Sequence, residues 1–222
     1  MPANKEDGVF VLEDALKKVL EDNKISKKKF VESIDIAACL GIDAKQSDQM
    51  VKGSIVLPNG SGKKVKVLVF AANDELKKEA LDAGATYAGL EDLIAKINDG
   101  FIDFDCCIAT PDVMSKISKV ARKLGPRGLM PSPKNGTVTK DVKKAIADAI
   151  KGKADFKNDK SGIIHCLVGK ADFKFDALVE NLKAVIRAIK DAKPEAAKGK
   201  YIKSLYINTT MGKAVSVCTQ SL

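Results

Sequence analysis

The arrangement of hydrophobic residues divides this chain of 222 residues into three parts. From about residue 62 to residue 155, short apolar runs alternate with stretches whose apolar residues recur every three or four positions, which is the strand–helix order of an α/β structure. Before and after this middle part, apolar and polar residues alternate with a period of two, which is typical of antiparallel strands. Because the outer parts share this pattern, we predict two domains: an α+β domain with an antiparallel sheet, built from residues 1–61 and 156–222, and an inserted α/β domain of residues 62–155.

The outer parts are predicted to contain two helices and five strands. Apolar residues at helical spacing indicate the helices, and two-residue alternation indicates the strands. In chain order these elements are a helix at 9–23, strands at 29–37, 50–57 and 161–168, a helix at 176–191, and strands at 201–208 and 213–218 that form a hairpin.

The middle part is predicted to contain two strands and four helices. Thr110 and Thr139 suit the N-cap positions of two of these helices, and Pro111 suits a first helical position. Residues 125–136 hold three prolines and three glycines, so they form a shaped loop. In chain order the elements are a strand at 64–70, helices at 74–83 and 90–98, a strand at 104–109, and helices at 111–124 and 141–151.

The charge of the chain favours a polyanionic partner. Lysine and arginine number 38 against 29 acidic residues, a formal net charge of +9. Residues 156–222 hold 12 basic and six acidic side chains, so the excess concentrates there, and a face of this kind binds nucleic acid in a salt-dependent way. An ordinary solvated lysine-rich surface is the alternative. The lysines concerned are Lys157, Lys160, Lys170, Lys174, those of the 198–203 run, and Lys27, Lys28 and Lys29.

Few residues are available for catalysis or metal binding. The single histidine, His165, lies in an apolar strand-like run, where a packed or surface histidine is more common than a general base. The five cysteines show no C-x-x-C spacing, so we expect buried reduced thiols and no zinc site. No G-x-G-x-x-G follows the strand at 64–70, and the 60–64 segment lacks the first glycine of a Walker loop. We therefore expect no metal, no cofactor and no enzymatic activity.

No segment of the sequence suggests a membrane. No uncharged apolar run approaches the ~20 residues of a membrane-spanning helix, and the first 23 residues lack the apolar region of a signal peptide. We expect a cytoplasmic protein.

Two features have both an ordinary structural interpretation and an RNA-binding one. In the 209–212 segment, Gly212 is either a turn glycine with a positive φ, or Thr210, Met211 and Gly212 form a turn that meets RNA hydroxyls, apolar surfaces and backbone. Phe30 is either a core aromatic or, beside Lys29, a surface for packing against bases or riboses.

The order of several short motifs resembles the L-one family of ribosomal proteins, which form the mobile stalk of the large subunit. The resemblance covers essentially the whole chain, and its most specific element is the 125–131 segment, GPRGLMP. The supporting motifs are Leu40–Asp43 (LGID), Ser47–Gln49 (SDQ), Leu57–Pro58 (LP), Ala109–Asp112 (ATPD) and Thr209–Gly212 (TTMG).

This resemblance implies a non-enzymatic protein whose terminal-built α+β domain grips ribosomal RNA, with a Rossmann-like α/β domain inserted across a hinge. The implied partners are the large-subunit rRNA stalk, the E-site tRNA whose release such proteins assist, the messenger RNA of its own operon, whose translation they repress, and the ribosome. A protein that is a monomer when free, with no membrane partner, is also implied. The RNA-binding residues carried over from the family are Lys29, Phe30, Ser33, Lys157, Lys160, Ser161, His165, Thr210, Met211 and Gly212.

An enzyme for a small ligand, using the α/β domain and the cleft between the two domains, is the alternative function. Stabilisation by added nucleotides in a thermal-shift screen would distinguish such an enzyme from an RNA-binding protein.

Overall fold

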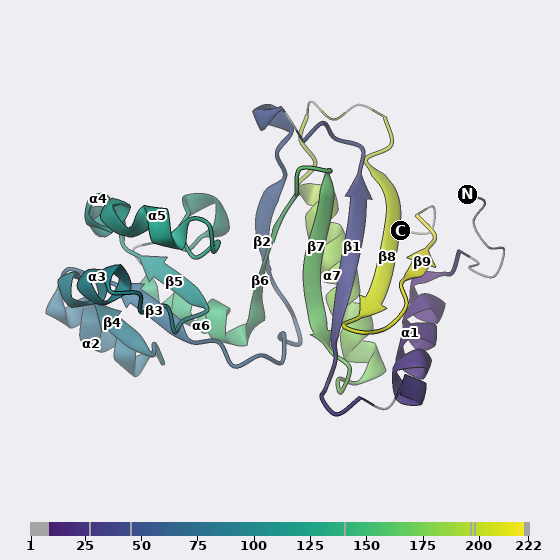
Figure 1. The fold of residues 1–222 in the computed structure, drawn as a ribbon, viewed down its shortest axis with the longest axis horizontal. Coiled ribbons are helices and arrows are strands. Elements are labelled where there is room, and N and C mark those ends of the chain that lie inside the picture. The colour runs from purple at the N-terminus through teal and green to yellow at the C-terminus, as the bar shows by residue number, and fades with distance from the viewer. Residues whose placement is uncertain are drawn as a thin grey trace. The chain divides into compact units, whose positions relative to one another are not determined.

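The computed structural model describes residues 9–26, 28–44, 46–139, 141–195, 197 and 199–219 (Figure 1). The chain forms two compact units. Unit 1 consists of Met1–Gly62 and Ala154–Leu222, and unit 2 consists of Lys63–Lys153.

An antiparallel four-stranded sheet is the centre of unit 1. Its strand order is β7-β1-β8-β9, so β1 lies between two strands from the C-terminal part of the chain. The side chains of β1 alternate between buried and half-buried, which is the pattern of a strand with one covered face. The strands are β1 (Ser33–Leu40), β7 (Ile163–Lys170), β8 (Ile202–Thr209) and β9 (Val215–Val217).

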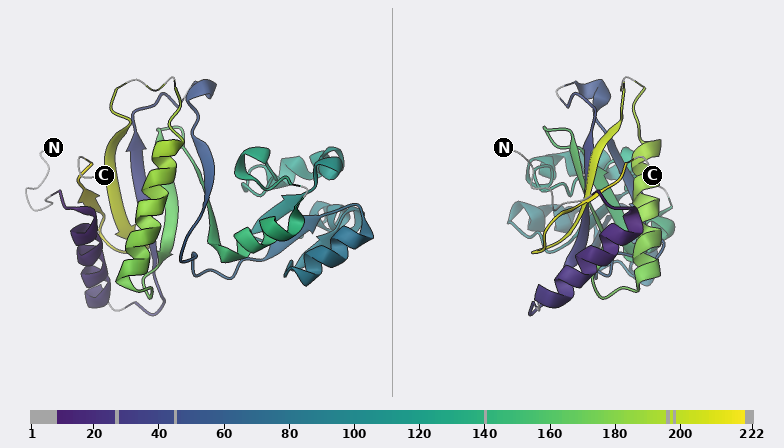
Figure 2. Two further views of the ribbon diagram at one scale, coloured as in Figure 1. Left: turned by 180° about the vertical axis from the view of Figure 1, so that it is seen from behind. Right: turned by 90° about the vertical axis from the view of Figure 1, so that its right-hand side faces the viewer.

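Two helices, α1 (Leu12–Ser26) and α7 (Phe175–Asp191), cover one face of this sheet (Figures 1 and 2). In the view from behind in Figure 2, α7 lies in front of the strands. Ile34 and Ile36 of β1 are fully buried in the same cluster as Leu182 of α7. Each such apolar side chain stabilises the fold by about 1.5–3 kcal/mol when it leaves water.

A second, two-stranded sheet consists of β2 (Lys52–Val56) and β6 (Lys153–Lys157). A glycine is required in β2 because a Cβ atom at Gly53 would lie 2.7 Å from the ring of Phe156 in β6. The loop that follows β2 is fixed to α7 by the buried Asn181, which accepts a hydrogen bond from the Asn59 N–H at 3.1 Å and donates to the Gly60 carbonyl at 3.1 Å.

Unit 2 has a parallel three-stranded sheet with helices on both faces. Its strand order is β4-β3-β5, with β4 at Tyr87–Gly89, β3 at Val67–Phe70 and β5 at Cys106–Ala109. Leu68 and Phe70 of β3 belong to the cluster formed with α3, α4 and α5, whereas Val67 and Val69 belong to the cluster formed with α2 and α6. The helices are α2 (Asp74–Asp82), α3 (Glu91–Asn98), α4 (Met114–Ile117), α5 (Ala121–Leu124) and α6 (Val142–Gly152).

Most predicted elements are confirmed to within about three residues, but the first helix begins at Leu12 and not at residue 9, and β1 begins at Ser33 and not at residue 29. Val9 and Val11 are 65% and 53% exposed and precede the helix, which starts at Leu12. Phe10 explains this difference, because its N–H donates to the Ser216 carbonyl and its carbonyl accepts from the Cys218 N–H. The segment thus pairs with the edge of the sheet instead of entering the helix.

The single helix predicted at 111–124 is wrong. Two short helices, α4 and α5, alternate there with 3-10 turns at Pro111–Val113 and Ser118–Val120. The Ser118 hydroxyl donates to the Met114 carbonyl at 3.0 Å at the junction of α4 and the second 3-10 turn, and such back-bonding bends helices. Thr110 does occupy the predicted cap position before Pro111, without a capping hydrogen bond from its side chain.

Two strands, β4 and β6, are absent from the sequence-based prediction. Three residues are too few for a period to be recognised in β4. Ala154 and Phe156 of β6 are buried and alternate with exposed or half-buried neighbours, but Gly152, with a φ of 104°, ends α6 only one residue earlier, so the strand pattern follows the helix without a loop.

Candidate nucleic-acid interface

The face of the main sheet opposite α1 and α7 carries no helix among the described residues and faces the viewer in Figure 1. Cross-strand pairing places four side chains in one row across its middle: His165, Ala37, Tyr206 and Ser216. His165 is exposed and Tyr206 is 39% exposed. This open face therefore presents an imidazole and a phenol in one row, separated by the small Ala37.

Asp35 is the one acidic side chain of β1 on the open face. It pairs with Leu167 on one side and Asn208 on the other, one row from His165. Burial raises the pKa of Asp35, and the nearby His165 acts in the opposite direction. The middle of the open face thus combines one carboxyl with hydrogen-bonding side chains.

One end of the open face is formed by the start of β1 and the turn after β8. The Thr210 N–H donates to the Ser33 carbonyl at 3.1 Å, and the Ser33 N–H donates to the Thr210 hydroxyl oxygen at 3.0 Å. The Gly212 N–H closes the turn on the Thr209 carbonyl at 3.2 Å. These bonds bring Ser33 together with Thr210, Met211 and Gly212, which lie far away in the sequence.

This turn exposes apolar surface. Met211 is 64% exposed, and Phe30, three residues before Ser33, is 54% exposed. The core position considered for Phe30 is therefore wrong. The positive φ expected for Gly212 is also wrong. Instead, a Cβ atom at Gly212 would collide with the hydroxyl oxygen of the buried Thr209, so close packing of the turn requires the glycine.

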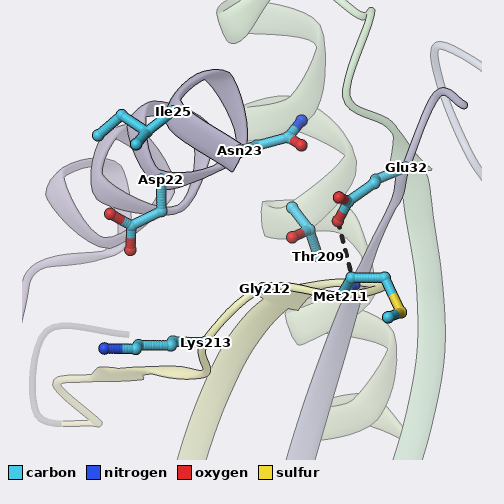
Figure 3. Close-up of a pocket in the computed structure, with 8 residues that line it drawn as sticks. All are labelled: Asp22, Asn23, Ile25, Glu32, Thr209, Met211, Gly212 and Lys213. Carbon is cyan, nitrogen blue, oxygen red and sulfur yellow. Dashed lines mark hydrogen bonds between the residues drawn. The ribbon is translucent and has the colours of Figure 1, made fainter. Parts of the chain in front are cut away.

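A buried carboxylate supports the turn from the helix-covered side. Glu32 is only 2% exposed, and its Oε2 accepts a hydrogen bond from the Met211 N–H at 3.1 Å (Figure 3). Hydrogen bonding by the Thr209 hydroxyl, and then by the Met211 N–H, lowers the pKa of Glu32, although its burial acts in the opposite direction. A cavity of about 300 Å³ lies beside it, lined by Asp22, Asn23, Ile25, Glu32, Thr209, Met211, Gly212 and Lys213.

The other end of the open face is formed by the β6–β7 connection. Asp159 shapes this connection, because its Oδ1 accepts hydrogen bonds from the Ser161 and Ile163 N–H groups, both at 2.8 Å. The bond from Ile163, followed by that from Ser161, lowers the pKa of Asp159. Lys160 and Ser161 are exposed beside it, and so is Lys157 at the end of β6.

The predicted RNA-binding residues thus fall into three groups along the sheet. Ser33 pairs with Lys170 and Cys39 pairs with Ile163, so the two ends are separated by six residues of β1, or about 20 Å. The first group, at the start of β1 and the turn, consists of Lys29, Phe30, Ser33, Thr210, Met211 and Gly212. His165 lies in the middle, and Lys157, Lys160 and Ser161 lie at the far end. Lys27 and Lys198 of the basic clusters lie outside the described residues.

Sequence reasoning missed Tyr206, Asn208, Asp35 and the supporting role of Glu32. The signal for Tyr206 and Asn208 was present, because they alternate with the buried Leu205 and Ile207 in β8. Nothing in the sequence indicates that the Glu32 carboxylate meets the Met211 N–H, since this contact joins residues 179 positions apart.

Other chemistry is sparse in the described part of the chain. Within it, no group of three or more His, Cys, Asp or Glu residues could hold a metal ion. Cys107 and Cys166 are buried, and burial raises the pKa of Cys166 to about 12, whereas Cys39, Cys106 and Cys218 are only half-buried, contrary to the expectation for buried thiols. No helix among the described residues is long and apolar enough to span a membrane.

An uncovered sheet face with exposed aromatic, histidine and lysine side chains is the type of surface on which RNA bases and phosphates pack. Residues 20–213 match the model of the ribosomal protein L1p/L10e family, and the chain belongs to this family.

Three relatives of this chain are each named large ribosomal subunit protein uL1. The protein from Chlamydia caviae is 50% identical over 194 residues, which cover 87% of this chain and 83% of that protein. The protein from Persephonella marina is 46% identical over 217 residues, covering 97% and 89%. The protein from Bdellovibrio bacteriovorus is 50% identical over 208 residues, covering 94% and 87%.

Proposed function

We propose that this protein is a non-enzymatic constituent of the large ribosomal subunit that binds ribosomal RNA through the open face of its unit 1 sheet. The observation that carries the proposal is the match of residues 20–213 to a ribosomal protein family, together with a main sheet that has one face without a helix among the described residues. The protein is then located on the ribosome, in the cytoplasm.

Different side chains of the open face take different parts of the RNA. Lys29, Lys157 and Lys160 neutralise phosphates, which gives affinity without reading sequence. Met211 and Phe30 pack against bases or riboses at the turn, and Tyr206 offers a stacking surface in the middle. Because these groups are spread over about 20 Å, they fit a folded RNA better than a short single strand, and recognition depends on shape.

The RNA proposed for this surface is the stalk of the large subunit, and two further roles follow from it. A messenger RNA site with the same shape would occupy the same face, so it would compete with the stalk RNA, and binding to the messenger of its own operon would repress translation when stalk RNA is scarce. The stalk-bound protein also assists release of the E-site tRNA in this proposal.

The two units are proposed to be two domains, with unit 2 a Rossmann-like domain inserted into an RNA-binding unit 1. The parallel β4-β3-β5 sheet with helices on both faces supports this description of unit 2. Native-state hydrogen exchange tests the division, because separate domains open with separate free energies. A single opening free energy for the amides of β1 and β3 would contradict it.

The function is tested by binding to a large-subunit stalk RNA fragment and to an unrelated hairpin of equal length, each titrated at several salt concentrations. We expect a preference of at least ~10³ for the stalk fragment that persists at physiological salt. Equal affinities that fall together as salt rises would mean that the net charge of +9 gives only non-specific attraction to RNA. That result would refute the proposal. The messenger role is tested by competition, in which unlabelled leader RNA of the operon should displace the stalk fragment.

A further inference from the structure

The position of Glu32 is unusual for a residue at an RNA-binding surface. A carboxylate repels phosphates, and a buried carboxylate costs free energy unless it is hydrogen-bonded. Glu32 is nevertheless 2% exposed, directly beside the turn that carries Met211. Its Oε1 has no hydrogen-bond partner among the residues that the structure describes. Hydrophobic packing therefore does not explain why a carboxylate is buried at this position.

The side chain of Glu32 points away from the open face. Burial alternates without a break along this segment, so Glu32 shares the helix-covered side with Ile34 and Ile36, while Ser33 lies on the open side. Asp22 and Asn23 near the end of α1 line the same cavity as Glu32 (Figure 3). RNA on the open face therefore meets the turn and not the carboxylate.

The turn is held from both sides of β1. On the open side, backbone groups of Ser33 bond both the N–H and the hydroxyl of Thr210. On the covered side, Glu32 Oε2 accepts from the Met211 N–H at 3.1 Å, and the neighbouring Thr209 hydroxyl helps to lower the pKa of this carboxyl. The Glu32 carbonyl is itself fixed, because it accepts from the Ala171 N–H at 2.9 Å. A hydrogen bond to an ionised acceptor is about twice as strong as a neutral one.

We propose that Glu32 is a positioning residue: it fixes the Thr209–Gly212 turn in its RNA-binding conformation before RNA arrives, and it does not itself touch RNA. This inference rests on the proposed function. Its physical basis is preorganisation, because a turn that is already ordered loses less conformational entropy when RNA binds.

Two substitutions separate positioning from charge. Glu32→Gln removes the charge but keeps an oxygen at the same reach, so the bond from the Met211 N–H persists. Glu32→Asp keeps the charge but is one methylene shorter, so the bond is lost. If Glu32 acted only through its charge, Gln would tighten RNA binding by removing repulsion and Asp would leave it unchanged. Positioning predicts the opposite order.

The measurements are the affinity for the stalk RNA fragment and the hydrogen exchange of the Met211 amide in the free protein. We expect Glu32→Asp to weaken binding at least ~10-fold and to speed exchange of the Met211 amide by a similar factor, while Glu32→Gln stays within about threefold of the wild type in both. Asp22→Asn is the matched control, because it removes a carboxylate from the same cavity without a bond to the turn, and we expect no loss of affinity. Unchanged protection of the Ile36 amide in β1 verifies that the sheet is intact.

Tighter binding by Glu32→Gln together with wild-type affinity of Glu32→Asp would overturn the inference, and so would a protected Met211 amide in the Asp variant. Failure of the proposed function is recognised separately, because the wild-type protein would then bind stalk RNA and hairpin equally. In the former case the wild type still discriminates between the two RNAs.

Discussion

Replacing the buried Asn181 with alanine should destabilise unit 1 substantially. Its side chain is fully buried in α7 and makes three hydrogen bonds: from the Asn59 N–H at 3.1 Å, to the Gly60 carbonyl at 3.1 Å and to the Val168 carbonyl at 2.9 Å. At about 0.5–1.5 kcal/mol for each bond, the expected loss is about 3 kcal/mol, or a factor of roughly 150 in the equilibrium constant for opening.

A matched control is the neighbouring Asn59→Ala. The Asn59 side chain is exposed, and its bonds to Ala177 and Glu180 lie at the surface, so its loss should cost less than about 0.5 kcal/mol. Asn181→Asp adds a test of direction, because a carboxylate can accept from Asn59 but would face the Gly60 and Val168 carbonyl oxygens. That variant should be the least stable at pH 7 and recover as the pH falls and the carboxyl is protonated.

The assay is native-state hydrogen exchange at the amides of β1, since these report the opening of unit 1 alone and need no two-state unfolding of the whole chain. The reasoning is refuted if Asn181→Ala lowers the opening free energy by less than about 1 kcal/mol, or by no more than Asn59→Ala does.

Four further outcomes are expected. Met211→Asp should place a carboxylate at the exposed turn and weaken stalk-RNA binding more than ~10-fold with the unfolding midpoint unchanged; unaltered affinity would remove the turn from the site. Lys160→Ala should reduce the salt slope of binding by about one unit without changing which RNA is preferred. Tyr206→Ala should weaken binding by about 1–3 kcal/mol, with Tyr206→Phe close to wild type, if the ring stacks on a base. Asp159 has a lowered pKa in the folded state, so its contribution to stability is present above the unfolded pKa of about 3.9 and is lost as the pH falls through the folded value; urea titrations should therefore show Asp159→Asn less stable than the wild type at pH 7, by a difference that shrinks as the pH falls below about 3.9.

The sequence was sufficient for elements with a long, regular period. Ile34 and Ile36 lie on either side of Asp35 and are buried in β1, and the apolar stripe of α7 predicts its position to within one residue. Such patterns predict which side chains are buried, because the polarity of each residue depends only on its own type. The change of period also predicts a division into two outer parts and a middle part, and that these form two domains stays a proposal.

Contacts between distant residues could not be inferred in the same way. Phe10 lies in the predicted first helix, but its backbone N–H and carbonyl form hydrogen bonds with Ser216 and Cys218 at the edge of the sheet. The collision between a Cβ at Gly212 and Thr209 depends on how the turn folds back on itself. Pairing of Tyr206 with Ala37 and of Ala37 with His165 requires the strand order, which no single segment encodes. The candidate site is built almost entirely from such contacts.

The strand order β7-β1-β8-β9 also has a consequence for biosynthesis. Both partners of β1 lie beyond residue 162, so β1 leaves the ribosome more than 120 residues before its first partner does. All of unit 2, Lys63–Lys153, is synthesised in that interval. Pairing over such long separations is slow because a large loop must close first. The open face, with its row of His165, Ala37, Tyr206 and Ser216, therefore comes into existence only after residue 216 has been synthesised.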